Sequence, residues 1–121
     1  MINGEYDKNN IFAKILRKEV KAEVVFENKY ILCFRDIFAK APVHILIIPK
    51  RQFQNIFDFS KNASNKEKVA IYDGFENIIK IFNLDPDGCR LISNYGSHGR
   101  QEVPHLHFHL LGGKDLGPMI S

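Results

Sequence analysis

The residues with the clearest potential for chemistry are three histidines that alternate with apolar residues near the C-terminal end. His105, His107 and His109 are separated by Leu106 and Phe108. On a β-strand, alternate side chains point to opposite faces, so the three imidazoles would line one face and the apolar side chains the other. Imidazole titrates near neutrality and can act as a nucleophile, a proton carrier or a metal ligand. The pattern therefore predicts a functional strand with His107 at its centre.

Three interpretations of this row remain open from the residues alone. A chance polar face is disfavoured, because a solvated sheet face normally also carries lysine, threonine and glutamate. A metal site is limited by distance. Same-face neighbours on a strand lie ~6.6 Å apart, so one ion cannot bind all three rings, although two of them can bind it together with His44. We favour nucleophilic and acid–base catalysis, in which one neutral ring attacks and its neighbours orient it, and we assign no metal ligand.

A polar loop containing glycine precedes the histidine row, at residues 94–102. Backbone N–H groups of such a loop can face an anion beside a catalytic strand. The loop lacks the GK[ST] ending of a nucleotide-binding P-loop, so the sequence argues against an ATPase.

The composition is that of an ordinary globular chain. Its 121 residues suffice for one domain spanning 1–121. A formal charge of +3, with no basic run longer than Lys50-Arg51, gives no reason to expect nucleic acid as a partner. Cys33 and Cys89 are far apart in the sequence, which fits a reducing compartment. The polar start and the lack of a ~20-residue apolar stretch lead us to expect a cytoplasmic protein without membrane contact.

Helical and strand periodicities alternate along the chain. We predict a helix at 11–18, strands at 22–27 and 30–35 joined by a tight turn, a strand at 44–48, a long helix at 64–82, and strands at 89–94 and 103–111. The long helix begins with a capping box formed by Ser64 and Glu67. The stretch 51–65 is interpreted as a loop or short helix. This order predicts an α+β domain, with an antiparallel sheet and helices on one face.

The run from His105 to Leu111 closely resembles the signature of the histidine triad (HIT) superfamily, in which three histidines alternate with apolar residues. The following Gly112-Gly113 resembles the branch of histidine triad nucleotide-binding proteins, the purine nucleoside phosphoramidases. The similarity extends from residues 11–15 to residues 116–119, and the segments 41–44 and 48–50 look like the family's strand that carries a fourth histidine.

The resemblance implies a five-stranded antiparallel sheet with two helices, a homodimer and a purine nucleotide as substrate, with no cofactor required. In such proteins the central histidine, matching His107, attacks phosphorus and carries the nucleotidyl group. His109 would contact the phosphate or the leaving group, and His105 and His44 would support the network. The remaining matches are Asp36 for the ribose, Phe12, Ile15, Phe34 and Ile37 for the purine pocket, and Asn94 and Gln101 for polar groups near the phosphate.

Two positions depart from the family pattern. Arg100 stands where a second glycine is common, and Glu102 stands where some members carry a serine proposed to assist the leaving group. Glu102 is expected at the nucleotide site, and for Arg100 two interpretations stay open: added charge beside the phosphate, or a side chain that points to water. The leaving-group preference therefore stays open. The expected activity is cleavage of a P–N bond through a nucleotidyl-histidine intermediate. The alternatives are a dinucleoside polyphosphate hydrolase, a metal-dependent hydrolase and a non-catalytic nucleotide-binding module.

Overall fold

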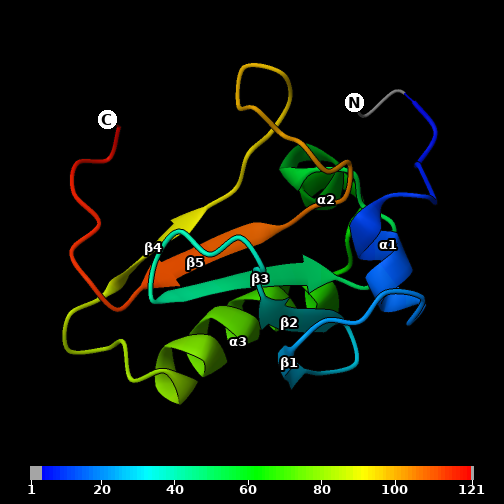
Figure 1. The fold of residues 1–121 in the computed structure, drawn as a ribbon. Helices are drawn as coiled ribbons and strands as arrows, with labels where there is room; N and C mark the ends of the chain where they lie inside the picture. Colours follow the sequence, from blue (N-terminus) through cyan, green and yellow to red (C-terminus); the bar gives the residue numbers. More distant parts are fainter. Residues whose placement is uncertain (1–3, 121) are drawn as a thin grey trace.

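The computed structural model describes residues 4–120, in which five antiparallel strands form one sheet with the order β1-β2-β3-β5-β4 (Figure 1). The strands are β1 (Val24–Glu27), β2 (Ile31–Arg35), β3 (Val43–Pro49), β4 (Cys89–Ile92) and β5 (Phe108–Gly112). The helices are α1 (Ile11–Leu16), α2 (Ile56–Asn62) and α3 (Asn65–Ile81). The predicted α+β class with a five-stranded antiparallel sheet is confirmed. None of the helices within the described residues is long and apolar enough to cross a membrane.

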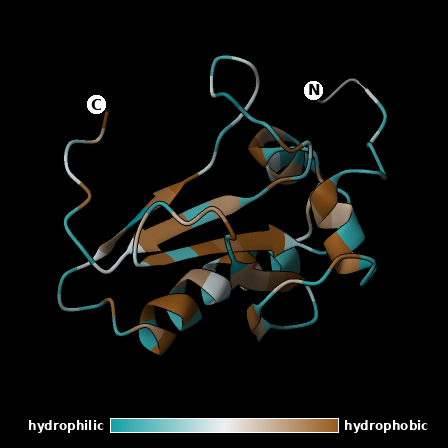
Figure 2. Cartoon of the chain, in the orientation of Figure 1, coloured by the Kyte–Doolittle hydropathy of each residue, from teal (hydrophilic) through white to brown (hydrophobic). Residues whose placement is uncertain are grey.

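Apolar side chains are buried on both faces of the sheet. α3 packs on one face, where Ile31, Cys33, Ile45 and Ile47 belong to a single core cluster. The alternate residues of β2 and β3 form a second cluster with Phe12 of α1. Figure 2 shows that the central strands are mostly hydrophobic, with short hydrophilic interruptions. The expectation that the helices share one face is therefore wrong. Successive residues of β2 and β3 point to opposite faces of the sheet and are buried on both, so a helix packs on each face.

Local capping explains where the helices begin. Asn10 caps α1 through its side-chain oxygen, and Ser64 and Glu67 form the predicted capping box of α3. α2 begins in the same way, because the side chain of Asn55 accepts a hydrogen bond from the backbone N–H of Asp58. Residues 4–120 thus contain three helices rather than the two that the resemblance implies, and the additional one, α2, lies in the stretch interpreted as a loop or short helix.

The strand that carries the histidines is shorter than predicted. β5 begins only at Phe108, so the predicted strand at 103–111 is wrong in its first half. The β3–β5 register pairs Ile47 with Phe108, and its continuation would set Pro49 opposite Leu106. Proline has no N–H to donate to a ladder, and a second proline at position 104 adds the same defect. The backbone N–H of Leu106 instead donates to the carbonyl of Phe53 at 2.8 Å.

Candidate active site

A pocket of about 760 Å³ opens beside the histidines, between α1, the ends of β2 and β3 and the segment around residues 92–103. Ten of the twelve predicted site residues line it: Phe12, Ile15, Phe34, Asp36, Ile37, His44, Asn94, Glu102, His107 and His109. The other two, His105 and Gln101, lie outside its lining. The structure therefore brings together residues that are up to 97 positions apart in the sequence, counted from Phe12 to His109.

His107 is buried at the wall of this pocket, with 6% of its surface exposed. Its Nδ1 lies 2.7 Å from the carbonyl oxygen of His105, which can only accept, so Nδ1 carries the proton. The lone pair of the neutral ring is then on Nε2. Burial lowers the pKa of His107 below the ordinary histidine value, so the ring is neutral at pH 7. Phe12 meets the ring edge-to-face, with 4.9 Å between the ring centroids.

His105 lies beneath the pocket and is fully buried. Its Nε2 donates to the carbonyl of Pro49 at 2.9 Å, and its Nδ1 lies 2.5 Å from the hydroxyl of Tyr6. Burial lowers the pKa of His105 to about 4, with a smaller contribution from His107. Both ring nitrogens have protein partners, so His105 acts as a support for the segment and not as a group that meets a substrate.

His44, His109 and Asp36 form a second group beside His107, with 5.1 Å between the ring centroids of His107 and His109. Nδ1 of His44 accepts from the backbone N–H of Lys40 at 3.0 Å, so its Nε2 carries the proton. That Nε2 lies 2.9 Å from Nδ1 of His109 and 3.3 Å from a carboxylate oxygen of Asp36. The proton of neutral His109 is therefore on Nε2. Burial lowers the pKa of His109 to about 4, and burial lowers that of His44 although Asp36 opposes the shift.

The same three residues are the histidine–carboxylate group best placed for a metal within residues 4–120. One ligand atom from each of Asp36, His44 and His109 lies within 4.8 Å of the others. This set differs from the one considered from the sequence, since it contains one triad histidine and a carboxylate instead of two triad histidines. An ion bound through Nε2 of His44 would replace the hydrogen bond that this nitrogen makes with Nδ1 of His109.

The loop before the triad is held by its own amides. Asn94 donates from Nδ2 to the carbonyl of Gly99 at 2.7 Å, and Gln101 donates from Nε2 to the carbonyls of Gln54 and Val103. Gln101 is thus committed to backbone contacts, which explains why it does not line the pocket. Arg100 does line it, with a φ of 60° in the left-handed region where glycine is favoured.

The apolar part of the pocket comes from α1, β2 and the loop after β2. Phe12 and Phe34 are buried and meet edge-to-face at 5.7 Å between centroids. Ile37 lies at the rim and is 86% exposed. The pocket therefore has an apolar end and a histidine-lined end, which suits a ligand with a flat apolar ring and an anionic group.

Sequence reasoning missed several contributors. Tyr6 and the backbone of Lys40 hold two of the imidazoles, and neither position carries a motif. Phe38, next to the predicted Ile37, also lines the pocket. In the sequence, only the closeness of Phe38 to the predicted site residues Asp36 and Ile37 indicates a place in the pocket. The further lining residues are Ile11, Val20, Lys21, Ala22, Arg35, Leu46, Ile92, Val103 and Leu111.

Known proteins resemble this chain over nearly its whole length. An uncharacterised HIT-like protein of Azospirillum brasilense is 41% identical over 96% of this chain and 95% of its own. The purine nucleoside phosphoramidase of Escherichia coli is 39% identical over 94% of this chain and 95% of its own. The crystal structure of a HIT family hydrolase from Legionella pneumophila superposes with a TM-score of 0.81 at 44% identity, covering 90% of this chain and 96% of that one. The sequence pattern of the HIT domain matches residues 17–116, and the chain belongs to the HIT domain family.

Proposed function

We propose that this protein is a hydrolase that cleaves the P–N bond of purine nucleoside phosphoramidates through a covalent intermediate on His107. The observation that carries the proposal is the hydrogen bond from Nδ1 of His107 to the carbonyl of His105. It leaves Nε2 as the lone-pair atom of a neutral ring at the wall of the pocket. A neutral imidazole held in one orientation is an effective nucleophile.

In the first displacement, Nε2 of His107 attacks the α-phosphorus and forms a P–N bond to the ring. The bond from phosphorus to the leaving amine breaks, and the amine takes a proton from water at the open end of the pocket. The attacking ring becomes cationic, and its Nδ1–H donates more strongly to the carbonyl of His105, which stabilises that charge.

In the second displacement, water attacks the same phosphorus and gives up one proton to the hydroxide that the first step leaves at the open end of the pocket. The bond to His107 breaks, the ring returns to its neutral state, and the nucleoside monophosphate leaves with the oxygen of water. His109 keeps a proton on Nε2 in both steps and can donate it as a hydrogen bond to a phosphate oxygen. His44 fixes that tautomer by donating to the other nitrogen of His109.

The choice of substrate rests on the apolar end of the pocket and on the relatives. Phe12, Phe34 and Ile37 offer an apolar slot for a base, and Asp36 stands where it can accept from ribose hydroxyls. The Escherichia coli relative is a purine nucleoside phosphoramidase by name. Arg100 and Glu102 line the pocket with opposite charges, so we assign them to the leaving-group side.

A turnover screen tests the proposal. Adenosine and guanosine phosphoramidates and diadenosine polyphosphates are offered in parallel, each with and without a chelator. We expect phosphoramidate hydrolysis that the chelator leaves unchanged. Preference for diadenosine polyphosphates, or loss of activity with the chelator, would instead favour a pyrophosphatase or a metal site at Asp36, His44 and His109. Tight nucleotide binding without any turnover would identify a binding module.

A further inference from the structure

The segment that carries the nucleophile lies outside the strand ladder. β5 begins at Phe108, so His105 and His107 have no ladder partners to fix their backbone. Leu106 is held by the hydrogen bond from its N–H to the carbonyl of Phe53. The backbone of His107 is contacted by Ser93, whose hydroxyl donates to the His107 carbonyl at 3.4 Å. The orientation of the His107 ring depends on what holds His105, because the carbonyl of His105 is the partner of Nδ1 in His107.

Two groups hold the ring of His105. Pro49, at the end of β3, accepts from Nε2 at 2.9 Å. Tyr6 reaches Nδ1 with its hydroxyl at 2.5 Å, and its ring meets the imidazole edge-to-face with 5.6 Å between centroids. Because Nε2 is the donor, Nδ1 is an acceptor and the Tyr6 hydroxyl donates to it. Burial raises the pKa of Tyr6, so the phenol remains protonated and able to donate.

Tyr6 is itself fixed on both sides along the chain. Before it, the carbonyl of Gly4 accepts from Nε2 of Gln54 at 2.6 Å. After it, the carbonyl of Asp7 accepts from the side chain of Asn10 at 2.7 Å, and Asn10 caps α1. The segment is thus attached both to α1 and to the stretch before α2, although it precedes the residues that match the HIT domain.

We propose that Tyr6 is a positioning residue for the nucleophile, acting on His107 through the imidazole and carbonyl of His105. This inference rests on the proposed function. The hydroxyl holds His105 as the neutral tautomer with its proton on Nε2, and that tautomer makes the bond to Pro49 that fixes the segment against β3. Without the hydroxyl, a fully buried acceptor is left without its partner, and the ring of His105 loses one of its two hydrogen bonds.

Tyr6 does not line the pocket, so its loss should leave nucleotide binding intact. It should affect the chemical step, since attack needs Nε2 of His107 aligned with phosphorus. The expected kinetic signature of Tyr6→Phe is a fall in kcat of about tenfold, with KM and the affinity for adenosine monophosphate within about twofold of wild type.

The test compares Tyr6→Phe with Tyr30→Phe, a half-buried tyrosine that packs against the opposite core. Nitrogen-15 NMR of the histidine rings is recorded for each protein beside the kinetics. We expect Tyr6→Phe to shift the ring signals of both His105 and His107 and to lower kcat, and Tyr30→Phe to do neither. Tyr6→Leu, which also removes the ring, should lower kcat at least as far.

The inference is overturned if Tyr6→Phe leaves the ring signals of His107 unchanged, or if it lowers only the unfolding free energy and leaves kcat at the wild-type value. A fall in kcat for Tyr6→Leu alone would assign the effect to ring packing and would also overturn the role of the hydroxyl. If wild-type protein hydrolyses no phosphoramidate, the proposed function fails, and the NMR signals of His107 alone decide whether Tyr6 positions this ring.

Discussion

At the scale of single residues, the hydrogen bonds leave two of the four site histidines, His107 and His109, with one ring nitrogen available to a substrate. His107 exposes a lone pair at Nε2, and His109 exposes a proton at the same position of its ring. His105 and His44 have protein partners on both nitrogens. A nucleophile and a hydrogen-bond donor therefore stand side by side, with 5.1 Å between the ring centroids of His107 and His109.

The protonation state of His107 predicts the acid limb of the pH profile. Burial lowers its pKa below 6.5, so the attacking ring stays neutral as the pH falls through that value and is protonated only at lower pH. Because kcat/KM reports the free enzyme, we expect its acid limb to lie below pH 6.5. An acid limb at or above pH 6.5 in a pH–rate series would contradict this assignment.

Asp36 has two structural partners in addition to its predicted ribose contact. One carboxylate oxygen accepts from the backbone N–H of Phe38 at 2.8 Å, and the other faces His44. Asp36→Ala should weaken the binding of adenosine monophosphate by about 1.5–3 kcal/mol, since the ribose hydroxyls lose a charged acceptor. Titration calorimetry measures this loss, with Asp73→Ala on α3 as a control that should bind normally. Equal affinity in both variants would remove Asp36 from the binding site.

At the scale of elements, the contact between α3 and the sheet depends on one glycine. Gly74 is buried, and a Cβ at this position would lie 2.5 Å from Cδ1 of Ile31 and 3.4 Å from Cγ2 of Ile47. Glycine weakens a helix by about 1 kcal/mol relative to alanine, a cost that is visible in the sequence. The structure shows the compensating gain, which is the close approach of α3 to β2 and β3.

Gly74→Ala should therefore destabilise the protein although alanine favours helices. Ile31 is fully buried, so its methyl group must move within a packed core. We expect a net loss of about 1–2 kcal/mol in the free energy of unfolding by urea, after the gain in helix propensity. The matched control, Asp73→Ala, changes the neighbouring exposed position and should be neutral or stabilising. A stabilised Gly74→Ala protein would contradict this prediction and would show that the side chain of Ile31 can move aside without a loss of stability.

The elements also show how far the sequence alone could lead. Periodicity and capping residues located α1, α3 and the β1–β2 hairpin to within two residues at each end, because these signals act locally. The sequence pattern predicts one continuous strand for the triad, whereas in the structure β5 begins only at Phe108, because prolines on two different segments interrupt the ladder. The face covered by α1 and the contact between Tyr6 and His105 depend on tertiary packing. No local pattern in the sequence encodes either.

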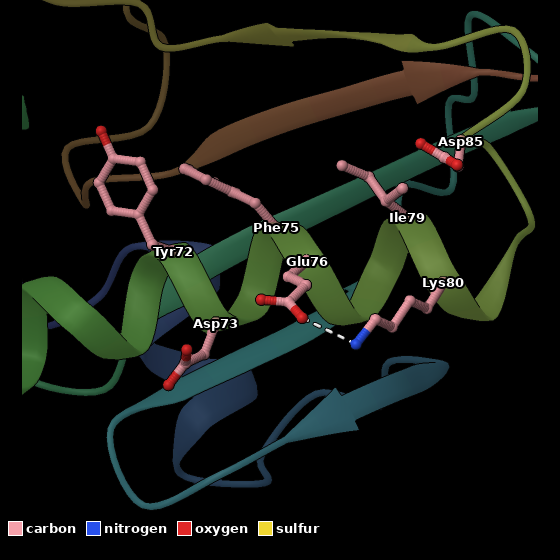
Figure 3. A pocket seen from close by; sticks show the side chains of 7 residues that line it. All are labelled: Tyr72, Asp73, Phe75, Glu76, Ile79, Lys80 and Asp85. Carbon is pink, nitrogen blue, oxygen red and sulfur yellow. Dashed lines mark hydrogen bonds and ion pairs between the residues drawn. The ribbon is translucent and has the colours of Figure 1, made fainter.

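At the scale of the whole molecule, one surface stands apart from the site. A shallow hollow of about 620 Å³ lies along α3, where Tyr72, Phe75 and Ile79 lie on the side toward β4 and β5 (Figure 3). Tyr72 is 73% exposed, and β4 is an edge strand with Leu91 43% exposed. An unpaired strand edge beside an apolar helix face favours pairing with a second copy of the chain.

The family resemblance implies a homodimer, and from these surfaces we expect it to join through β4 and α3. Leu91→Glu should convert the dimer to a monomer, because it places a charge at the centre of the interface. Val24→Glu, an exposed change on the opposite edge strand β1, is the control and should remain dimeric. Light scattering at micromolar concentration measures both, and a monomeric wild-type protein would contradict the expectation.

The central claim is that His107 forms a covalent bond to phosphorus during turnover. Wild-type protein is mixed with adenosine phosphoramidate labelled at phosphorus and quenched in the millisecond range, and the modified residue is located by mass spectrometry. We predict an acid-labile nucleotidyl adduct on His107 whose rate constant of formation is at least equal to kcat. A folded His107→Ala protein should show no adduct, a loss of turnover of several orders of magnitude and near-normal affinity for adenosine monophosphate. Robust turnover by His107→Ala would contradict the account.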